Sequence, residues 1–408
     1  MPVTSSCRIC SGTVREFLDF GRQPLSDAFV TPEDLAEEFF FTLAVGICES
    51  CTMVQLMEEV PRDRMFHQGY PYLSSGSAVM REHFQAIAKR FLATELTGPD
   101  PFIVELGSND GTMLGVIAES GVRHLGVEPS GGVADLAAAK GVRVRKDFFE
   151  EETAADILAG EGPADVVYAA NTLCHIPYME SILRGVDTLL AHSGIFVFED
   201  PYFADILERT SFDQIYDEHF FFFTVRSVQE MARRFGFELV DAERLPVHGG
   251  EVRYTLARPG TRPVSQAVTD LLAEESAAGI TEPATLAGLA SRVELIRERL
   301  PALLGELRER GERVVGYGAT AKSATVTNYC GIGPELVPFV CDTTVGKQGR
   351  LTPGAHIPVR SPEAFRDPYP SYALLFAWNH AQEIMEKEKE FREAGGKWIL
   401  YTPEVRVV

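Results

Sequence analysis

The stretch from Phe102 to Gly111 constrains the fold of this chain more than any other. An apolar strand pattern, Phe102–Leu106, runs directly into a turn with a glycine at each end, Gly107–Gly111, and then into a helical pattern. Further strand and helix patterns alternate as far as Asp200. Strands joined by helices in this way run parallel in a doubly wound sheet, so the region predicts a Rossmann-like α/β domain.

The chain of 408 residues is long enough for several hydrophobic cores, and we divide it into four stretches: 1–65, 75–258, 265–310 and 311–408. The first is a small module whose core is too small to be stable without a staple. The second is the doubly wound domain, closed by an antiparallel hairpin. The third is a helical connection in which Pro301 should kink or divide the second helix. The fourth predicts a smaller Rossmann-like α/β domain.

Two Cys-x-x-Cys pairs fall in the first stretch and hold four of the seven cysteines: Cys7, Cys10, Cys48 and Cys51. Two such pairs supply four thiolates in the tetrahedral arrangement that suits zinc. Because sulfur fills all four positions, the ion would be structural, and it would be the staple that the module needs. Two unrelated pairs of core or redox cysteines are the alternative.

Polar and glycine residues follow the strand patterns of the second stretch where each strand ends. After Glu105, Gly107 and Gly111 let the backbone turn sharply and approach a ligand closely. Ligands of open α/β sheets bind at this edge. Glu128 ends the next strand, where a carboxylate accepts hydrogen bonds from both hydroxyls of a ribose.

The third and fourth strands end in residues that suit the rest of an adenosyl ligand. Asp147 and Phe148 offer a carboxylate and a ring to an adenine, and Asn171 lies where a methionine moiety would be. The pattern Glu-x-Gly-x-x-x-Gly also differs from the dinucleotide fingerprint Gly-x-Gly-x-x-Gly. The sequence therefore predicts an S-adenosylmethionine site, which includes Asn109 of the turn. An unrelated nucleotide-binding α/β domain is the alternative.

The segment Tyr216-Asp217-Glu218-His219 places a phenol, two carboxylates and an imidazole directly before the apolar run Phe220–Phe223. Such a run buries its neighbours and shifts their protonation. His219 is the candidate general base, Glu218 the carboxylate beside it, and Tyr216 a donor to a developing oxyanion. A charged loop before a buried strand, with His219 paired to a carboxylate, is the alternative.

Three more residues are candidates to face the same cleft. His175 closely follows the fourth strand and points to the same edge of the sheet. Tyr70 and Tyr72 lie in the segment that leads into the doubly wound domain, which either folds over the cleft or is a simple loop. His248, in the late hairpin, is interpreted as part of a turn.

The fourth stretch opens with a second glycine-rich turn, Gly316–Ser323, after an apolar strand. Backbone amides at this helix start, with Lys322, are suited to hold a pyrophosphate. Asp342 ends the next strand in the manner of a ribose-binding carboxylate. Three interpretations remain open: a nicotinamide site, a domain that has lost its nucleotide, or a contact with the diphosphate of a substrate bound in the second stretch.

The formal net charge of −21 disfavours nucleic acid and anionic lipid as partners. No apolar run reaches the ~18–20 residues that a membrane span needs. The N-terminus shows no secretory signal. We therefore expect a cytoplasmic protein that binds a small molecule, with a monomer as one possibility.

The four cysteines, the E-L-G-S-N-D-G turn, the Tyr216–His219 segment and the turn G-Y-G-A-T-A-K-S occur together and in this order. In this combination, over the whole chain, the sequence resembles the zinc-containing, S-adenosylmethionine-dependent sugar C-3-methyltransferases of antibiotic biosynthesis. The resemblance implies a nucleotide-sugar substrate, a dTDP-linked 3-amino-4-keto-2,3,6-trideoxyhexose. Its C-4 ketone acidifies the C-3 proton, a base removes that proton, and the resulting enolate attacks the methyl group of the sulfonium.

Carried onto this chain, the resemblance implies that His219 is the base and that Glu218 orients it or holds the amino group of the substrate. Tyr216, Tyr70 and His175 would stabilise the enolate or position the sugar. Substrate binding is assigned to Tyr72, Lys322 and Ser323.

Two other classes of function compete with this interpretation. An NAD-dependent oxidoreductase would use the turn at Gly316-x-Gly318, which lacks the third glycine of the fingerprint. A non-catalytic nucleotide-binding protein is disfavoured by the intact carboxylates at the strand ends, Glu105, Glu128 and Asp147.

Overall fold

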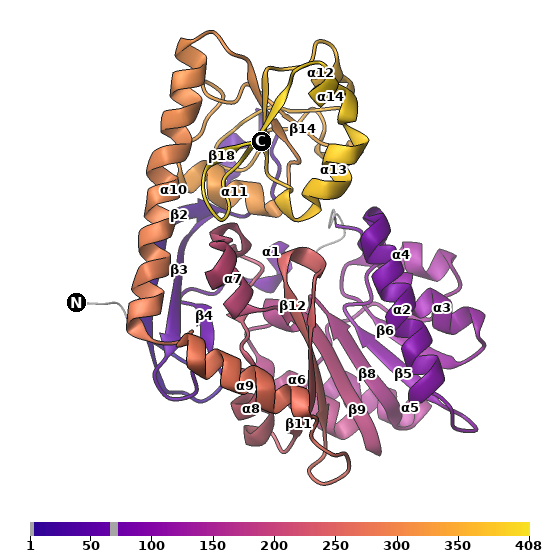
Figure 1. Cartoon of the computed structure of the whole chain (residues 1–408). Helices are drawn as coiled ribbons and strands as arrows, with labels where there is room; N and C mark the ends of the chain where they lie inside the picture. Colours follow the sequence, from indigo (N-terminus) through magenta and orange to yellow (C-terminus); the bar gives the residue numbers. More distant parts are fainter. Residues whose placement is uncertain (1–3, 66–71) are drawn as a thin grey trace.

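Three β-sheets define the architecture in the computed structural model of the chain, which describes residues 4–65 and 72–408 (Figure 1). The first sheet belongs to the N-terminal module, the second to the doubly wound domain and the third to the C-terminal domain. One long helix runs along the side of the molecule and connects the second domain with the third (Figure 1). The predicted α/β fold class is confirmed.

The first sheet is antiparallel, in the order β1-β2-β3-β4-β10. Its strands are β1 (Thr4–Ser6), β2 (Thr13–Pro24), β3 (Phe40–Cys48), β4 (Val54–Leu56) and β10 (Phe221–Phe222), and a short helix, α1 (Arg62–Met65), follows β4. Strand β10 comes from the doubly wound domain, where the sequence predicts a buried apolar run. Its pairing with β4 fixes the neighbouring segment Tyr216–His219 against the N-terminal module.

The second sheet has the order β11-β12-β9-β8-β5-β6-β7. Its strands are β5 (Phe102–Leu106), β6 (Arg123–Val127), β7 (Val144–Arg145), β8 (Ala164–Ala170), β9 (Leu190–Pro201), β11 (Glu238–Leu245) and β12 (Glu251–Ala257). Strands β5 to β9 are parallel, and β11 and β12 form the predicted antiparallel hairpin. The strand order reverses at β5, which places a ligand crevice at the carboxyl ends of β5 and β8.

Helices pack on both faces of this sheet, in two hydrophobic clusters. They are α2 (Ala78–Thr94), α3 (Thr112–Glu119), α4 (Gly131–Ala139), α5 (Glu151–Glu161), α6 (Met179–Leu189), α7 (Phe203–Arg209) and α8 (Val225–Arg234). The sequence pattern Ser227–Phe235 predicts a helix with Ser227 as its N-cap, which is wrong: the cap is Thr224, whose hydroxyl accepts from the amide of Ser227, while the Ser227 hydroxyl accepts from the amide of Thr224. This reciprocal pair starts the helix about one turn earlier.

Helices α9 (Gln266–Ala278) and α10 (Pro283–Glu309) form the predicted connection. Of the two effects predicted for Pro301, a kink or a division, the division does not occur, because helix α10 passes through Pro301 as one element. Proline inside a helix costs ~3 kcal/mol, but α10 buries a row of side chains on both sides of the proline that stabilises the helix: Leu289, Val293, Ile296, Leu300, Leu304 and Leu307. No helix in the described part of the chain is long and apolar enough to cross a membrane.

The third sheet has the order β15-β14-β13-β16-β17-β18 and is parallel except for β18. Its elements are β13 (Val314–Tyr317), α11 (Ala321–Tyr329), β14 (Val340–Cys341), β15 (Val359–Arg360), α12 (Glu363–Arg366), β16 (Tyr372–Leu375), α13 (Ala381–Lys387), α14 (Lys389–Glu393), β17 (Lys397–Leu400) and β18 (Arg406–Val407). The sequence pattern over Ala381–Ala394 predicts a single helix, but the structure has two, α13 and α14. The break lies at Glu388, whose buried carboxylate accepts hydrogen bonds from Tyr317 and Arg366.

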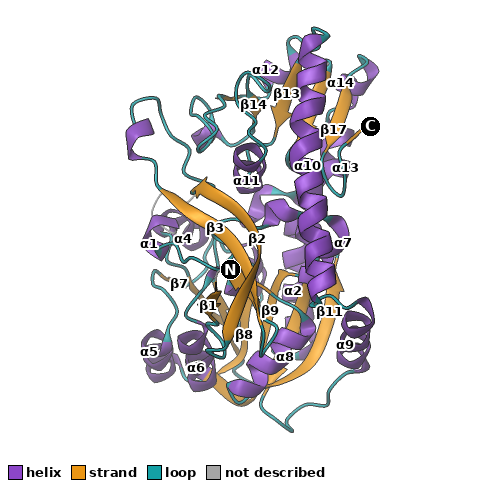
Figure 2. Ribbon diagram, turned by 90° about the vertical axis from the view of Figure 1, so that its left-hand side faces the viewer, coloured by secondary structure: helices purple, strands orange, loops and turns teal. Residues whose placement is uncertain are grey.

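One hydrophobic cluster extends through all three modules and fixes them against one another. The ring of Phe20, on β2, packs against Phe212 of the doubly wound domain and Tyr329 of α11. The hydroxyl of Thr325, also on α11, donates to the carbonyl of Ile215 at 2.9 Å. Figure 2 shows the long β2–β3 hairpin beside α10, below the C-terminal domain. The walls of any cleft between the modules are therefore held by a shared core.

Candidate active site

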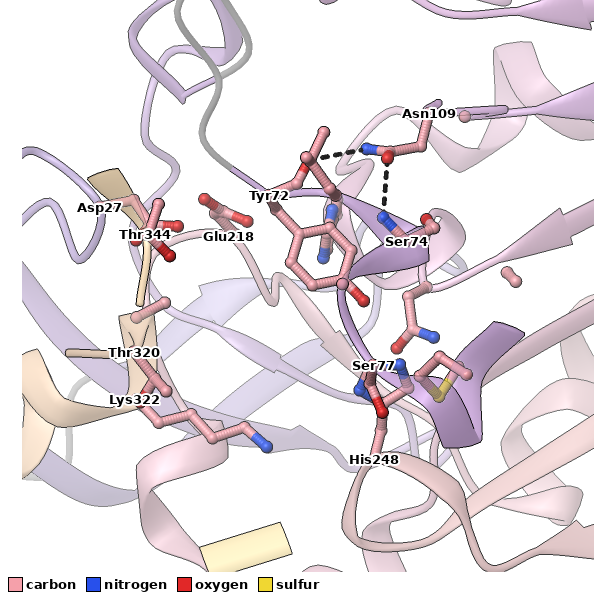
Figure 3. Close-up of a pocket in the computed structure, with 18 of the residues that line it drawn as sticks. Asp27, Tyr72, Ser74, Ser77, Asn109, Glu218, His248, Thr320, Lys322 and Thr344 are labelled. Atoms are coloured by element: carbon pink, nitrogen blue, oxygen red, sulfur yellow. Dashed lines mark hydrogen bonds between the residues drawn. The ribbon is translucent and has the colours of Figure 1, made fainter. Parts of the chain in front are cut away.

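One cleft of about 730 Å³ opens at the carboxyl ends of the central strands. All three modules contribute to its walls. Glu128 and His219 come from the doubly wound domain. Asp27 comes from the N-terminal module and Lys322 from the C-terminal domain (Figure 3). A cleft between domains at the switch in strand order is where α/β proteins bind their ligands.

The four predicted zinc ligands converge at the end of the first sheet. The sulfur atoms of Cys7 and Cys51 lie 3.6 Å apart, those of Cys10 and Cys48 lie 3.4 Å apart, and all four lie within 4.8 Å of one another. Zinc–sulfur bonds of ~2.3 Å place tetrahedral sulfur atoms about 3.8 Å apart, so the group fits a zinc ion.

Each cysteine pair sits on the same kind of tight turn. The carbonyl of Cys7 accepts from the amide of Ser11, and that of Cys48 accepts from the amide of Thr52. Ser11 and Thr52 both have φ of 61°, in the left-handed region. The two turns therefore present their sulfur atoms in the same way, as a closed structural site requires.

The turn after β5 wraps around the carboxylate of Glu128. Its two oxygens accept hydrogen bonds from the amides of Asn109, at 2.9 Å, and Ser130, at 2.7 Å. Burial is the main influence on this carboxyl and raises its pKa, and the two amide bonds oppose that effect. The carboxylate is fixed at the cleft wall at the place predicted for the ribose hydroxyls.

Glycine is required at the start of this turn. Gly107 has φ of +66°, and a Cβ there would overlap the hydroxyl of Thr172. At Gly111, with φ of +73°, a Cβ would lie 2.9 Å from the Cβ of Ala137. Gly107 therefore keeps the cleft wall open, whereas Gly111 lets α3 begin against α4. A cradle without side chains beside a fixed carboxylate fits an adenosyl ligand.

Asn109 links the cradle to the segment that enters from the N-terminal side. Its side-chain carbonyl accepts from the amide of Ser74 at 2.9 Å, and its amide donates to the carbonyl of Tyr72 at 3.2 Å (Figure 3). Tyr72, 40% exposed, lines the cleft as predicted. Tyr70 lies outside the described residues.

The other predicted cofactor residues divide into two groups. Phe148 and Asn171 line the cleft, at the ends of β7 and β8. Asp147 does not line it and pairs with Arg145, with 2.9 Å between nitrogen and oxygen. Glu105 is buried behind the turn, where burial and the nearby Glu128 raise the pKa of its carboxyl well above the ordinary value.

The predicted acid–base residues form a connected pair. Nδ1 of His219 lies 2.8 Å from the carbonyl oxygen of Gln214, which can only accept, so Nδ1 carries the proton. Burial and the nearby His175 and Lys322 hold the pKa of His219 well below its ordinary value, so the ring is neutral. Nε2 therefore accepts, and its partner is the hydroxyl of Tyr216 at 2.8 Å.

This arrangement corrects the roles that the sequence suggested for two residues. The orienting group of His219 is the carbonyl of Gln214, because it holds the proton on Nδ1. The single proton of the Tyr216 hydroxyl points at His219 and is not available to another acceptor. Glu218 lines the cleft, as do Asp27 and Thr344 (Figure 3).

His175 stacks on His219, with ring centroids 5.2 Å apart. Burial lowers the pKa of His175 to about 3, so this ring is neutral too. The ligand atoms of Cys174, His175 and His219 lie within 4.8 Å of one another. However, both nitrogens of His219 are engaged, and stacked imidazoles do not aim their in-plane lone pairs at one point. The geometry therefore favours a stacked pair of neutral imidazoles over a metal centre.

The second glycine-rich turn closes the cleft from the C-terminal domain. Asp342 accepts from the amides of Ala319, at 2.8 Å, and Thr344, at 2.7 Å, much as Glu128 does in the first turn. The ammonium of Lys322 lies 5.3 Å from the ring centre of Trp378, and burial lowers the pKa of Lys322. Ser323 is buried away from the cleft, and its hydroxyl donates to the carbonyl of Thr320.

Several cleft residues were missed in the sequence, among them Asp27 and His248. Asp27 follows β2 and pairs with Lys347 at 3.1 Å, and no pattern in a short polar loop indicates such a position. His248 was interpreted only as part of a turn, yet it lines the cleft. Since β11 runs parallel to β9, the turn after β11 lies at the carboxyl edge, and the predicted hairpin already contained that signal.

Three family models match successive parts of the chain. They are described as "Putative zinc binding domain" at residues 7–66, "Methyltransferase domain" at 79–242 and "C-methyltransferase C-terminal domain" at 246–403. With the cradle and the cleft, these matches define an S-adenosylmethionine-dependent methyltransferase. The chain is 36% identical to C-methyltransferase NovU from Streptomyces niveus, over 98% of this chain and 96% of NovU. It therefore belongs to the family of C-methyltransferases that includes NovU.

Other similarities are confined to part of the chain. A sarcosine/dimethylglycine N-methyltransferase from Halorhodospira halochloris is 26% identical over 40% of this chain and 61% of its own length. Among solved structures, magnesium protoporphyrin IX methyltransferase from Synechocystis PCC 6803 is 12% identical, with a TM-score of 0.35 over 45% of this chain and 88% of that protein. Likeness at this level adds nothing to the assignment.

Proposed function

We propose that this C-methyltransferase methylates C-3 of a dTDP-linked 3-amino-4-keto-2,3,6-trideoxyhexose. One observation carries the proposal: a neutral, oriented histidine, hydrogen-bonded to a buried tyrosine, faces a cleft that also contains the cofactor cradle. Methylation of carbon requires a base that removes a proton from that carbon, whereas an oxygen or nitrogen nucleophile already has a lone pair. The C-4 ketone would make the C-3 proton acidic enough for such a base.

Tyr216 and His219 are proposed to act as one base. The phenol oxygen takes the carbon-bound proton as it passes its own proton to Nε2 of His219, and the carbonyl of Gln214 stabilises the resulting imidazolium through Nδ1. Burial keeps His219 unprotonated beforehand. Bound S-adenosylmethionine would supply the electrophilic methyl group, and Glu128 and the turn at Gly107 would hold it.

The C-terminal domain is proposed to hold the nucleotide end of the substrate. Lys322 is a half-buried cation in the first turn of α11, and it lines the cleft together with Thr320 and Ala321 at that helix start. The hydroxyl of Thr320, the N-cap residue, is buried and has no hydrogen-bond partner among the described residues. An ammonium, a helix N-terminus and a free hydroxyl suit a diphosphate.

The carboxylates on the opposite wall suit the amino group of the sugar. Glu218 and Asp27 both line the cleft there, and Asp27 forms an ion pair with Lys347. We assign the ammonium contact to Glu218. The sugar is proposed to contact Tyr72, Tyr70 and His175, and the cofactor to contact Asn109, Asn171 and Phe148. The four cysteines are proposed to bind a structural zinc ion. The proposed domain boundaries remain 1–65, 75–258, 265–310 and 311–408.

The test is turnover with defined nucleotide sugars. The enzyme is incubated with S-adenosylmethionine and the dTDP-linked 3-amino-4-keto sugar, and the product is analysed by mass spectrometry and NMR. A gain of one methyl group, located at C-3, is the expected result. Matched sugars with a 3-hydroxyl group or a reduced 4-hydroxyl group are the controls. Methylation of the reduced sugar at oxygen, or of the amino group, would refute the proposal.

A further inference from the structure

The imidazole of His248 presents a buried nitrogen to the cleft that the mechanism above does not use. His248 lies in a one-turn helix, η5 (Val247–Gly249), directly after β11. Its Nε2 is buried and has no hydrogen-bond partner among the residues that the structure describes. Leaving such a group unpaired costs ~1–3 kcal/mol, and a ligand in the cleft is the partner that would remove this penalty.

The backbone around His248 is built to aim this ring. His248 has φ of 49°, in the left-handed region, which costs an ordinary residue ~1–2 kcal/mol. Gly249 and Gly250 follow with φ of +95° and +114°. A Cβ at Gly249 would lie 2.7 Å from the ring of Trp378, and one at Gly250 would overlap the carboxylate of Asp205. The turn is therefore packed tightly on both sides, and the direction of the ring is set before any ligand arrives.

The charge state of His248 limits what it can bind. Burial is the main cause that lowers the pKa of His248 to about 3, and the nearby Lys322 and His380 contribute to the same shift. The ring is neutral at ordinary pH, so it cannot be the counter-ion of a phosphate. A neutral imidazole is instead a hydrogen-bond donor to an oxygen that gains charge during a reaction, since it need not lose a proton to do so.

The position of His248 matches an unfilled requirement of the proposed reaction. The ring of His248 lies at the boundary between the domains, close enough to His219 to lower the pKa of His219. Lys322 in turn lowers the pKa of His248, and its side chain extends toward that ring (Figure 3). An enolate needs a donor at its oxygen, but the proton of Tyr216 already points at His219. Nε2 of His248, which has no hydrogen-bond partner among the described residues, is the candidate donor.

We propose that Nε2–H of His248 donates the hydrogen bond that stabilises the substrate's ketone oxygen as it becomes an enolate oxygen; this role rests on the function proposed above. In that step the C–H bond breaks and its proton passes to the Tyr216–His219 pair. The electron pair of the bond forms the C=C bond, and the π pair of the ketone moves onto oxygen. The N–H of His248 stays on nitrogen, so His248 is neither oxidised nor deprotonated.

Exchange of the C-3 proton isolates this step from methyl transfer. The enzyme is mixed in D₂O with the 3-amino-4-keto nucleotide sugar and S-adenosylhomocysteine, and deuterium at C-3 is followed by NMR. The variants are His248→Phe, His248→Asn and His248→Gln, with the exposed His192→Gln as the matched control. Asparagine readily adopts left-handed conformations, so His248→Asn keeps the turn, while its shorter side chain moves the hydrogen-bond donor away from the ketone oxygen. Affinity for dTDP and melting temperature are measured for each.

We expect His248→Phe and His248→Asn to slow both exchange and kcat by ~10²–10³-fold, the loss typical of one oxyanion donor. Affinity for dTDP should not change, and His248→Gln should recover part of the rate. Exchange at the wild-type rate in folded His248→Phe and His248→Asn, or a change in KM alone, would overturn the role of His248 and leave the proposed function standing. Wild-type enzyme that neither exchanges nor methylates the sugar would overturn both.

Discussion

Replacing Tyr216 by phenylalanine separates two forms of the base. If Tyr216 relays the proton, Tyr216→Phe removes the group that would connect His219 to the substrate. If His219 takes the proton directly, the same change frees the lone pair on Nε2 that Tyr216 now occupies at 2.8 Å. The two mechanisms therefore predict opposite results for one deleted oxygen atom.

The expected loss follows from the chemistry of a general base. Removing such a group reduces the rate by ~10²–10⁴-fold, which raises the barrier by about 3–5 kcal/mol at 1.36 kcal/mol for each factor of ten. The variant also leaves a buried imidazole nitrogen unpaired, which lowers the free energy of unfolding by ~1–3 kcal/mol. This second effect alters stability, not the rate of the folded enzyme.

The assay is C-3 deuterium exchange together with single-turnover methyl transfer, at a temperature where the variant is folded. Tyr254→Phe is the matched control, because Tyr254 also has a buried hydroxyl, which lacks a hydrogen-bond partner in the described part of the chain. It does not line the cleft. We expect the control to keep wild-type rates. If Tyr216→Phe exchanges as fast as the wild type, the relay is refuted and His219 is the direct base.

Three further outcomes are expected. Gly107→Ala should weaken binding of S-adenosylhomocysteine by at least ~10-fold in calorimetry. A side chain at positive φ costs ~1–2 kcal/mol, and its overlap with Thr172 adds to that cost. The control Gly115→Ala, with open space around its Cβ, should bind with wild-type affinity. Cys48→Ser should lower both bound zinc and melting temperature, and an unchanged melting temperature would speak against a structural ion. The pKa of His175 in the folded protein is about 3, so below about pH 6.5 only the unfolded chain binds a proton at this residue, and the free energy of unfolding decreases as the pH falls. Relative to His175→Gln, the wild type should lose about 1 kcal/mol of this free energy between about pH 6.5 and about pH 5.5 in urea titrations. Equal losses in the two proteins would contradict a neutral buried ring.

The cofactor half of the site was predictable because local patterns determine it. The strand Phe102–Leu106, the turn glycines and Glu128 are each placed by short-range signals, and parallel strands bring their carboxyl ends to one edge. Asp147 shows the limit of this reasoning. The carboxylate of Asp147 forms an ion pair with the neighbouring Arg145 and does not line the cleft. A rule based on where strands end cannot detect such a competing ion pair.

The catalytic half depended on contacts between distant segments. Nothing local reveals that Gln214 holds the proton of His219, or that Tyr216 donates to it, because both follow from how the loop folds around β10. That strand crosses into the sheet of another module, a long-range pairing that periodicity does not encode. The continuity of α10 through Pro301 likewise reflects tertiary packing that outweighs a local rule.

The loop after β2 has a consequence for anyone who recombines genes of this family. The amide of Ser26 donates to Asp217 at 2.9 Å, and Asp27 beside it lines the cleft, so this loop of the N-terminal module adjoins both the Tyr216–His219 segment and the cleft. A crossover placed between this module and the methyltransferase domain would pair a loop from one parent with a base from the other. Chimeras should therefore inherit part of their substrate preference from the N-terminal parent, and the productive ones should be those that carry this loop and the Tyr216–His219 segment from the same source.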